Sequence, residues 1–165
     1  MDQRPHQGIH RHQRRLPVVT ERAGAKPLVL VAACALIDGD GNVLISRRPE
    51  GKPLAGLWEF PGGKLERGEA PEHGLIRELE EELGIAIEPS SLKPLTFSSF
   101  PYAGFHLLMP IYACWRWLGE VSAKEGQSLA WVRPDALSDY EMPPADEPLK
   151  GVLPGLLGCL RERVD

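Results

Sequence analysis

The order of the predicted elements indicates an α+β fold, an α/β/α sandwich with a mixed β-sheet between helices. Strand-like apolar segments come first, one amphipathic helix interrupts them, and a second helix follows the last strand, an order typical of this class. The length of 165 residues suits one domain. No apolar run approaches the roughly 20 residues that a membrane-spanning helix needs. We therefore expect one globular domain outside the membrane.

The first 27 residues differ in composition from the rest of the chain. They hold six basic residues, two acidic residues and three of the five histidines, with little apolar periodicity. Such a segment cannot bury enough apolar surface to fold alone. We therefore expect a disordered basic tail over residues 1–27 and a globular domain over residues 28–165. The domain then carries 13 basic and 21 acidic residues, a formal net charge of −8.

Charge and cysteine content restrict the partners and the compartment. A domain at −8 is a poor candidate for stable binding to nucleic acid, whereas its carboxylates suit a divalent cation. Cys34, Cys114 and Cys159 are widely spaced and odd in number, which argues against a disulfide framework and fits a reducing compartment. The N-terminus lacks the apolar core of a secretory signal, so we expect a cytoplasmic protein.

The first predicted strands surround a turn. Residues 28–37 are almost continuously apolar, which predicts a strand buried on both faces. Residues 38–42, Asp-Gly-Asp-Gly-Asn, are typical of a turn, and residues 43–47 are expected to return as the second strand of a hairpin. Residues 57–60 predict another short strand, which we expect to end at Pro61-Gly62-Gly63.

Two helices and three further strands follow. Pro71 suits the first turn of a helix and Gly84 suits a left-handed C-cap, so we expect a helix over residues 71–83. The later strands are expected over residues 95–100, 106–117 and 128–132. A final helix is expected from about Pro148, with an apolar face and a kink at Pro154.

Three glutamates lie on one face of the first predicted helix. At 100° per residue, Glu78, Glu81 and Glu82 fall within one arc, and Glu80 points elsewhere. A separate arc collects the apolar residues Leu75, Ile76, Leu79 and Leu83. Like charges at these spacings destabilise a helix by roughly a few tenths of a kcal/mol per pair. The cluster is therefore either a solvated acidic face or a site for a hard divalent cation such as Mg²⁺.

The loop before this helix favours the metal site. Pro61-Gly62-Gly63 brings backbone without side chains toward the acidic face, where the Gly62 carbonyl could join the metal ligands. Lys64 adds a cation suited to a phosphate oxygen. A metal, a glycine turn and a lysine together indicate phosphate-ester chemistry, in which the metal neutralises charge, positions the phosphates and activates water.

Nine positions over 23 residues match a known pattern. The pattern G-x5-E-x7-R-E-U-x-E-E-x-G-U, with U apolar, is complete as Gly63, Glu69, Arg77, Glu78, Leu79, Glu81, Glu82, Gly84 and Ile85. The chain therefore resembles the Nudix hydrolases. Beyond this Nudix box, residues 45–48, 57–64, 124–127 and 142–149 make it similar to the MutT-type members, the 8-oxo-dGTP diphosphatases.

This resemblance implies a fold and an activity. The family fold is a mixed sheet between helices, which agrees with the order of the elements. Nudix enzymes use Mg²⁺ or Mn²⁺ to hydrolyse a nucleoside diphosphate linked to another group. The MutT-type reaction converts a nucleoside triphosphate such as 8-oxo-dGTP to its monophosphate and pyrophosphate. We therefore expect a Mg²⁺-dependent diphosphatase for a small nucleotide, and the sequence leaves its oligomeric state open.

The resemblance also assigns catalytic roles. It implies that Glu78, Glu81 and Glu82 are metal ligands, helped by the Gly62 carbonyl. Glu125 resembles a further glutamate that contacts a metal or the attacking water. The general base is left unassigned among these glutamates, because coupled carboxylates share protons.

Substrate-binding and structural roles come from the same resemblance. Lys64 is expected at a phosphate, and the positions that match the base pocket are Arg48, Glu59, Phe60 and Asp146. Many related enzymes carry asparagine where this chain has Asp146, which could alternatively be only the N-cap of the last helix. The box residues expected to hold the loop and the helix together are Gly63, Glu69, Arg77 and Gly84.

Three other functions remain open. A Nudix hydrolase for CTP or dCTP, a dinucleoside polyphosphate or ADP-ribose would use the same glutamates and Lys64. A non-catalytic Nudix-fold module that binds nucleotide or a partner protein would not need them. Nucleic-acid binding through the basic tail would be salt-sensitive and would vanish on removal of residues 1–26.

Overall fold

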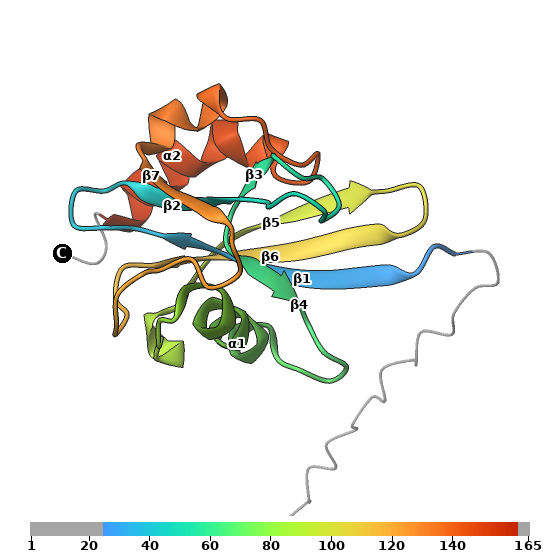
Figure 1. Cartoon of the computed structure of the whole chain (residues 1–165), viewed down its shortest axis with the longest axis horizontal. Helices are drawn as coiled ribbons and strands as arrows, with labels where there is room; N and C mark the ends of the chain where they lie inside the picture. Colours follow the sequence, from blue (N-terminus) through green and yellow to red (C-terminus); the bar gives the residue numbers. More distant parts are fainter. Residues whose placement is uncertain (1–24, 162–165) are drawn as a thin grey trace, which may run out of the picture.

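The computed structural model describes residues 25–161, so residues 1–24 of the expected tail and the last four residues lie outside the described residues. Over residues 25–161 the strands form two sheets (Figure 1). The larger sheet has the order β4(Gly62–Lys64), β1(Leu28–Leu36), β6(His106–Cys114), β5(Lys93–Pro101). The smaller sheet has the order β3(Trp58–Glu59), β2(Val43–Arg47), β7(Ser128–Val132).

The larger sheet is mixed and has helices on both sides. β1 runs parallel to β6, whereas β4 is antiparallel to β1 and β5 is antiparallel to β6. In Figure 1, α1(Pro71–Leu83) lies on one side of the sheets and α2(Glu147–Arg161) on the other. Two short 3₁₀ helices complete the described chain, η1(Pro89–Ser91) and η2(Pro134–Asp139). The predicted α+β class and mixed sheet are therefore confirmed.

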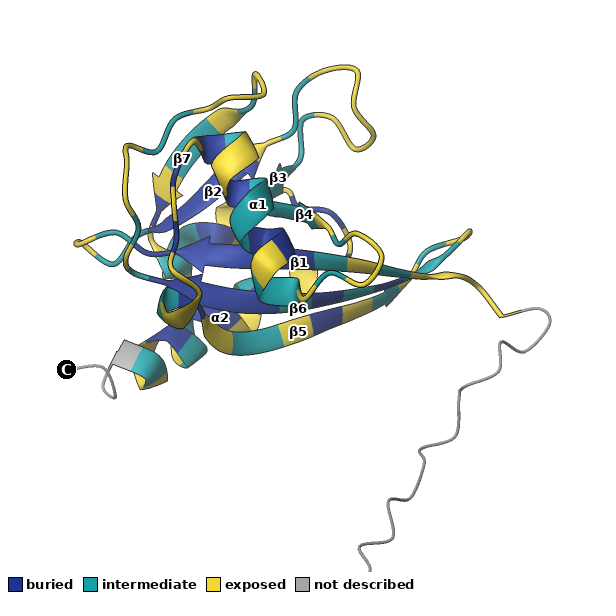
Figure 2. Ribbon diagram, turned by 90° about the horizontal axis from the view of Figure 1, so that it is seen from below, coloured by how far each residue is buried: buried dark blue, intermediate teal, exposed yellow. Residues whose placement is uncertain are grey.

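The core consists of two clusters of buried side chains. One cluster packs on α1 and includes the fully buried Leu75, Leu79 and Leu83. The other includes residues of both sheets and of α2, with Phe60 among them. Because successive side chains of β1 alternate between the two clusters, this strand is buried on both faces, but only over its second half. Figure 2 shows its first residues extending beyond α1, where exposed and half-buried residues alternate.

The predicted hairpin over residues 28–47 is wrong. β1 and β2 belong to different sheets, and the described strand pairing between these segments is one antiparallel bridge from Ile37 to Val43. Since β4 and β6 already occupy both edges of β1, β2 pairs with β3 and β7 instead. The Asp38 carboxylate stabilises the turn by accepting hydrogen bonds from the backbone N–H groups of Asp40 and Asn42, at 3.0 and 2.8 Å.

The structure also differs from the predicted strands in two places. The short strand expected over residues 57–60 does end before Pro61, as β3, but Gly62–Lys64 then forms the unpredicted strand β4 and pairs with β1. Gly62 has a φ of 147°, and a Cβ there would overlap the Ala32 carbonyl oxygen, so this close pairing needs glycine. The strand expected over residues 106–117 ends at Cys114. Within the described range, no helix is long and apolar enough to cross a membrane.

Candidate functional site

Helix α1 orients the glutamates of the Nudix box. Its leucines are fully buried, and this orientation leaves Glu78 and Glu82 half-buried while Glu80 and Glu81 are exposed. The helix ends at Gly84, which has a φ of 71° and donates its backbone N–H to the Glu80 carbonyl at 2.9 Å. The predicted left-handed cap is therefore present.

Arg77 ties α1 to the loop that precedes it. Its Nε and Nη2 donate to the two carboxylate oxygens of Glu69, each at 3.0 Å, and Nη2 also donates to the Lys64 carbonyl at 3.2 Å. Glu69 accepts a further hydrogen bond from the Glu66 backbone N–H at 2.8 Å. The Arg77 hydrogen bonds, followed by that of Glu66, lower the pKa of Glu69 to about 2. Glu69 therefore stays ionised and bound to Arg77 at neutral pH.

Strand β4 lies very close to the acidic face of α1. A Cβ at Gly63 would overlap the carboxylate of Glu78, so a larger residue there would displace this side chain. Glu78 Oε1 accepts a hydrogen bond from Arg77 Nη1 at 2.7 Å. The Gly62 backbone N–H donates to Glu82 Oε2 at 3.2 Å. The two glycines thus bring strand backbone into contact with two of the box glutamates.

Glu82 lies where its ionised form is unfavourable. Burial raises its pKa to about 7, and the Gly62 hydrogen bond opposes this shift. The carboxylates of Glu59, Glu125 and Glu78 raise the pKa further. Partly buried carboxylates that repel one another are stabilised by a divalent cation, which restores the ionised form.

A small pocket of about 110 Å³ opens beside Glu82. Two ion pairs line it: Arg48 Nε lies 2.7 Å from Glu59 Oε2, and Lys52 Nζ lies 2.7 Å from Glu125 Oε2. The complete lining is Ser46, Arg48, Pro49, Lys52, Glu59, Gly62, Glu82, Glu125 and Gln127. The structure therefore brings residues of β2, β3, β4 and α1 together with the loop before β7.

The donors at this pocket fit a hard divalent cation, because they are oxygen atoms of several carboxylates. Among residues 25–161, however, no three acidic, histidine or cysteine side chains are grouped closely enough to hold a metal. Glu78 is paired with Arg77, and Glu125 is paired with Lys52. A metal would therefore have to draw these carboxylates away from their basic partners.

Asp146, which was predicted to contact the base, lies directly before α2. It is only 5% exposed, and burial raises its pKa to about 7. The charge of Glu59 raises the pKa further, while a hydrogen bond with the Phe60 backbone and the charge of Arg48 lower it. Burial therefore favours the protonated carboxyl at pH values where an exposed aspartate is ionised. These interactions connect Asp146 with the other three residues expected to read the base.

Three aromatic rings pack together near Asp146. Tyr102 stacks on Phe105 with ring centroids 4.8 Å apart and contacts Phe100 edge-on at 4.9 Å. Burial raises the pKa of Tyr102, a hydrogen bond with the Ala145 backbone lowers it, and the nearby Asp146 raises it. The hydroxyl therefore lies close to the carboxyl of Asp146.

Three polar residues of the pocket were missed by sequence reasoning: Ser46, Lys52 and Gln127. The sequence did contain a sign that could have identified Lys52, since it is the one lysine of the glycine- and proline-rich loop 49–56. Gln127 connects two elements, because Nε2 donates to the Glu82 carbonyl and Oε1 accepts from the Glu125 N–H, each at 2.8 Å. Conversely, five of the predicted metal and substrate residues do not line this pocket: the exposed Lys64 and Glu81, the half-buried Glu78, and the buried Phe60 and Asp146.

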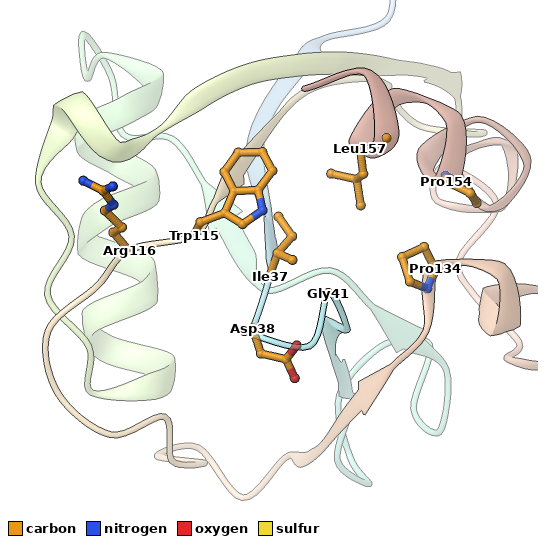
Figure 3. A pocket seen from close by; sticks show the side chains of 10 residues that line it. Ile37, Asp38, Gly41, Trp115, Arg116, Pro134, Pro154 and Leu157 are labelled. Carbon is orange, nitrogen blue, oxygen red and sulfur yellow. The ribbon is translucent and has the colours of Figure 1, made fainter. Parts of the chain in front are cut away.

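A larger cavity of about 420 Å³ lies near the start of β2, away from these residues (Figure 3). Ile37, Trp115 and Leu157 give it a largely apolar lining. The carboxylate of Asp38 is already bonded to the turn that it stabilises. We therefore assign the chemistry to the smaller pocket, where charged groups gather.

Comparisons with a family model, with related proteins and with solved structures agree on one family. The model of the NUDIX domain family matches residues 32–150. An 8-oxo-dGTP diphosphatase of Escherichia coli strain K12 is 38% identical over 73% of this chain and 92% of that protein. A CTP pyrophosphohydrolase of the same strain is 35% identical over 73% of this chain and 88% of that protein. The crystal structure of a MutT NUDIX hydrolase from Burkholderia pseudomallei aligns with a TM-score of 0.60 and 31% identity, covering 72% of this chain and 88% of the other.

Proposed function

The chain belongs to the NUDIX domain family, and we propose that it hydrolyses 8-oxo-dGTP to 8-oxo-dGMP and pyrophosphate. Hydrolases of this family depend on divalent metal ions, and we propose Mg²⁺ here, with Mn²⁺ as a substitute. We further propose that residues 28–165 form the catalytic domain and act in the cytoplasm on free nucleotides. The net charge of −8 on this domain supports a free nucleotide over a nucleic acid.

The metal site that we propose uses the box carboxylates. Glu78, Glu81 and Glu82 would hold the ion with the Gly62 carbonyl, and Glu125 would contact it or the attacking water. When bound, the ion neutralises phosphate charge and makes water more acidic. The chain then has to position the phosphates, accept a proton from the water and hold the base, while the new P–O bond forms and the anhydride P–O bond breaks.

Base recognition is proposed for Arg48, Glu59, Phe60 and Asp146, with Lys64 at a phosphate. Buried Asp146 is the observation that carries this proposal. A carboxyl that is partly protonated at neutral pH both donates and accepts a hydrogen bond. 8-Oxoguanine has an N7–H donor beside its O6 acceptor, whereas guanine has two acceptors there. A neutral carboxyl matches the oxidised base at both atoms.

A second candidate is hydrolysis of CTP or dCTP. The similarity to the CTP pyrophosphohydrolase is nearly as high as that to the 8-oxo-dGTP diphosphatase. The same glutamates would serve both reactions, so the base pocket has to distinguish them. Cytosine also has a donor beside an acceptor, N4–H and N3, so hydrogen bonds to Asp146 alone do not separate the two bases. We favour the oxidised purine because three relatives that are 37–38% identical to this chain are 8-oxo-dGTP diphosphatases.

The test is a nucleotide panel of 8-oxo-dGTP, dGTP, dCTP, CTP and ADP-ribose at low micromolar concentration with Mg²⁺. Pyrophosphate release gives the rates for the four triphosphates, and chromatography measures AMP formed from ADP-ribose and identifies the other products. We expect kcat/KM for 8-oxo-dGTP to exceed that for dGTP roughly a hundredfold, or by about 2.7 kcal/mol. Equal kcat/KM values for all nucleotides, or a preference for a nucleotide other than 8-oxo-dGTP, would support a Nudix hydrolase but overturn the proposed substrate.

A further inference from the structure

Lys52 lies in the loop between β2 and β3, residues 49–56, at the edge of the pocket. Arg48 supports this loop, because its Nη1 donates to the Pro53 carbonyl and its carbonyl accepts from the Gly56 N–H, each at 3.0 Å. Leu54 has a φ of 60°, a left-handed conformation that is rare outside glycine and that contacts around it must maintain. The loop therefore has a defined shape that directs the Lys52 ammonium into the pocket.

The partner of Lys52 is Glu125, in the loop before β7. Their Nζ and Oε2 atoms are 2.7 Å apart, and both side chains are about half exposed. The pair thus connects two loops across the pocket that contains Glu82. An exposed ion pair of this kind contributes little to the free energy of unfolding, so a role in stability does not account for it.

Metal binding at Glu125 would change the electrostatic interactions of the Lys52 ammonium group. A carboxylate shared by a divalent cation and an ammonium group holds two positive charges within a few ångströms, where they repel. An anion placed between the two cations removes this repulsion. Phosphate is such an anion, and lysine binds it as a mobile point charge on a flexible chain.

We propose that Lys52 is a substrate-binding residue that exchanges Glu125 for the phosphate chain of the nucleotide when metal and nucleotide bind. This inference rests on the proposed function, which supplies the phosphates and the role of Glu125. Lys52 and Arg48 are the two basic residues lining the pocket, and Arg48 is already paired with Glu59. Lys52 is therefore the cation placed to meet phosphate beside Glu82.

The test measures binding of inorganic pyrophosphate to the full chain by calorimetry, with Mg²⁺ and with a chelator. With Mg²⁺, Lys52→Met should weaken binding at least about tenfold, which is about 1.4 kcal/mol. Lys52→Arg should stay within about threefold of the wild type because it keeps the charge. Lys93→Met, which removes an exposed lysine outside the pocket, is the matched control and should bind as the wild type does. The nucleoside 8-oxo-deoxyguanosine, which has no phosphate, should bind equally to all variants.

The metal-free measurement separates phosphate binding from a merely structural ion pair. Glu125→Gln frees Lys52 and should strengthen pyrophosphate binding, with a smaller gain when Lys52→Met is also present. A structural pair predicts instead that Glu125→Gln and Lys52→Met weaken binding alike, and that result would overturn the proposal. So would wild-type affinity in Lys52→Met. If the wild type does not hydrolyse 8-oxo-dGTP but Lys52→Met still weakens pyrophosphate binding, the proposed substrate is overturned and the role of Lys52 is supported.

Discussion

Glu82 combines the strongest signs of a metal ligand among the box glutamates, because it is half-buried, hydrogen-bonded by Gly62 and surrounded by other carboxylates. Glu82→Gln removes the charge with little change in volume. Loss of a residue that only supports a metal ligand costs roughly 10- to 100-fold in activity, so loss of a ligand should cost at least about a hundredfold in kcat/KM. Steady-state hydrolysis with a Mg²⁺ titration measures the effect.

The matched control for this substitution is Glu80→Gln. Glu80 belongs to the same helix but is exposed and outside the pocket lining, so its loss should change kcat/KM by less than about twofold. Activity of Glu82→Gln within a few-fold of the wild type would contradict the metal assignment.

Asp146 should make the stability of the protein depend on pH. Its pKa is about 7 in the folded state against 3.8 ordinarily, so the folded chain keeps a proton that the unfolded chain loses. The wild type should therefore lose stability as pH rises from about 4 to 7. Asp146→Asn has no such proton and should gain up to about 4 kcal/mol relative to the wild type over this range. Urea unfolding at a series of pH values measures the difference.

Asp139→Asn provides the comparison for Asp146→Asn, since Asp139 is an exposed carboxylate at the end of η2. Its pH profile of unfolding should parallel that of the wild type. Parallel profiles for Asp146→Asn and the wild type would show that burial of Asp146 does not hold its proton.

At the scale of elements, the end of α1 depends on Gly84. Alanine there would have to adopt a φ of 71°, and its Cβ would lie 2.6 Å from Lys124 Cε. The left-handed backbone alone costs about 1 to 2 kcal/mol for a residue with a Cβ, so Gly84→Ala should lower the free energy of unfolding by that amount. Chemical denaturation measures it.

Gly39→Ala is the control for this change. A Cβ at Gly39 would meet no atom within 4 Å, and the backbone there is not left-handed. Gly39→Ala should therefore be neutral or slightly stabilising, because alanine restricts the unfolded chain. Equal effects of the two substitutions would show that the cap does not control the end of the helix.

Elements defined by local chemistry could be predicted closely. Pro71, the spacing of the leucines and Gly84 lie within α1 itself, and its bounds agree with the prediction. β2 and β7 likewise agree. Pairing was less predictable, because the edges of β1 are taken by β4 and by β6, more than 60 residues further along the chain. The turn over residues 38–42 therefore connects two sheets and not two strands of a hairpin.

For the whole molecule, the basic tail remains a prediction. Residues 25–161 already contain the described core and pocket, so a chain that begins at Ala25 should keep kcat/KM within about twofold of the full chain. Activity assays on both chains test this. Salt-sensitive binding to DNA that disappears with the tail would instead support a nucleic-acid-binding arm.

The sequence by itself determined the family and most of the elements, and it predicted the role of the glutamates. These follow from residue types at fixed short spacings, which a helix or a turn converts directly into geometry. Only the tertiary structure decided which residues share the pocket with Glu82. Arg48, Lys52, Glu59 and Glu125 reach it from loops and strands far apart in the chain. Their burial, ion pairs and shifted pKa values depend on distances across the fold, which no local pattern encodes.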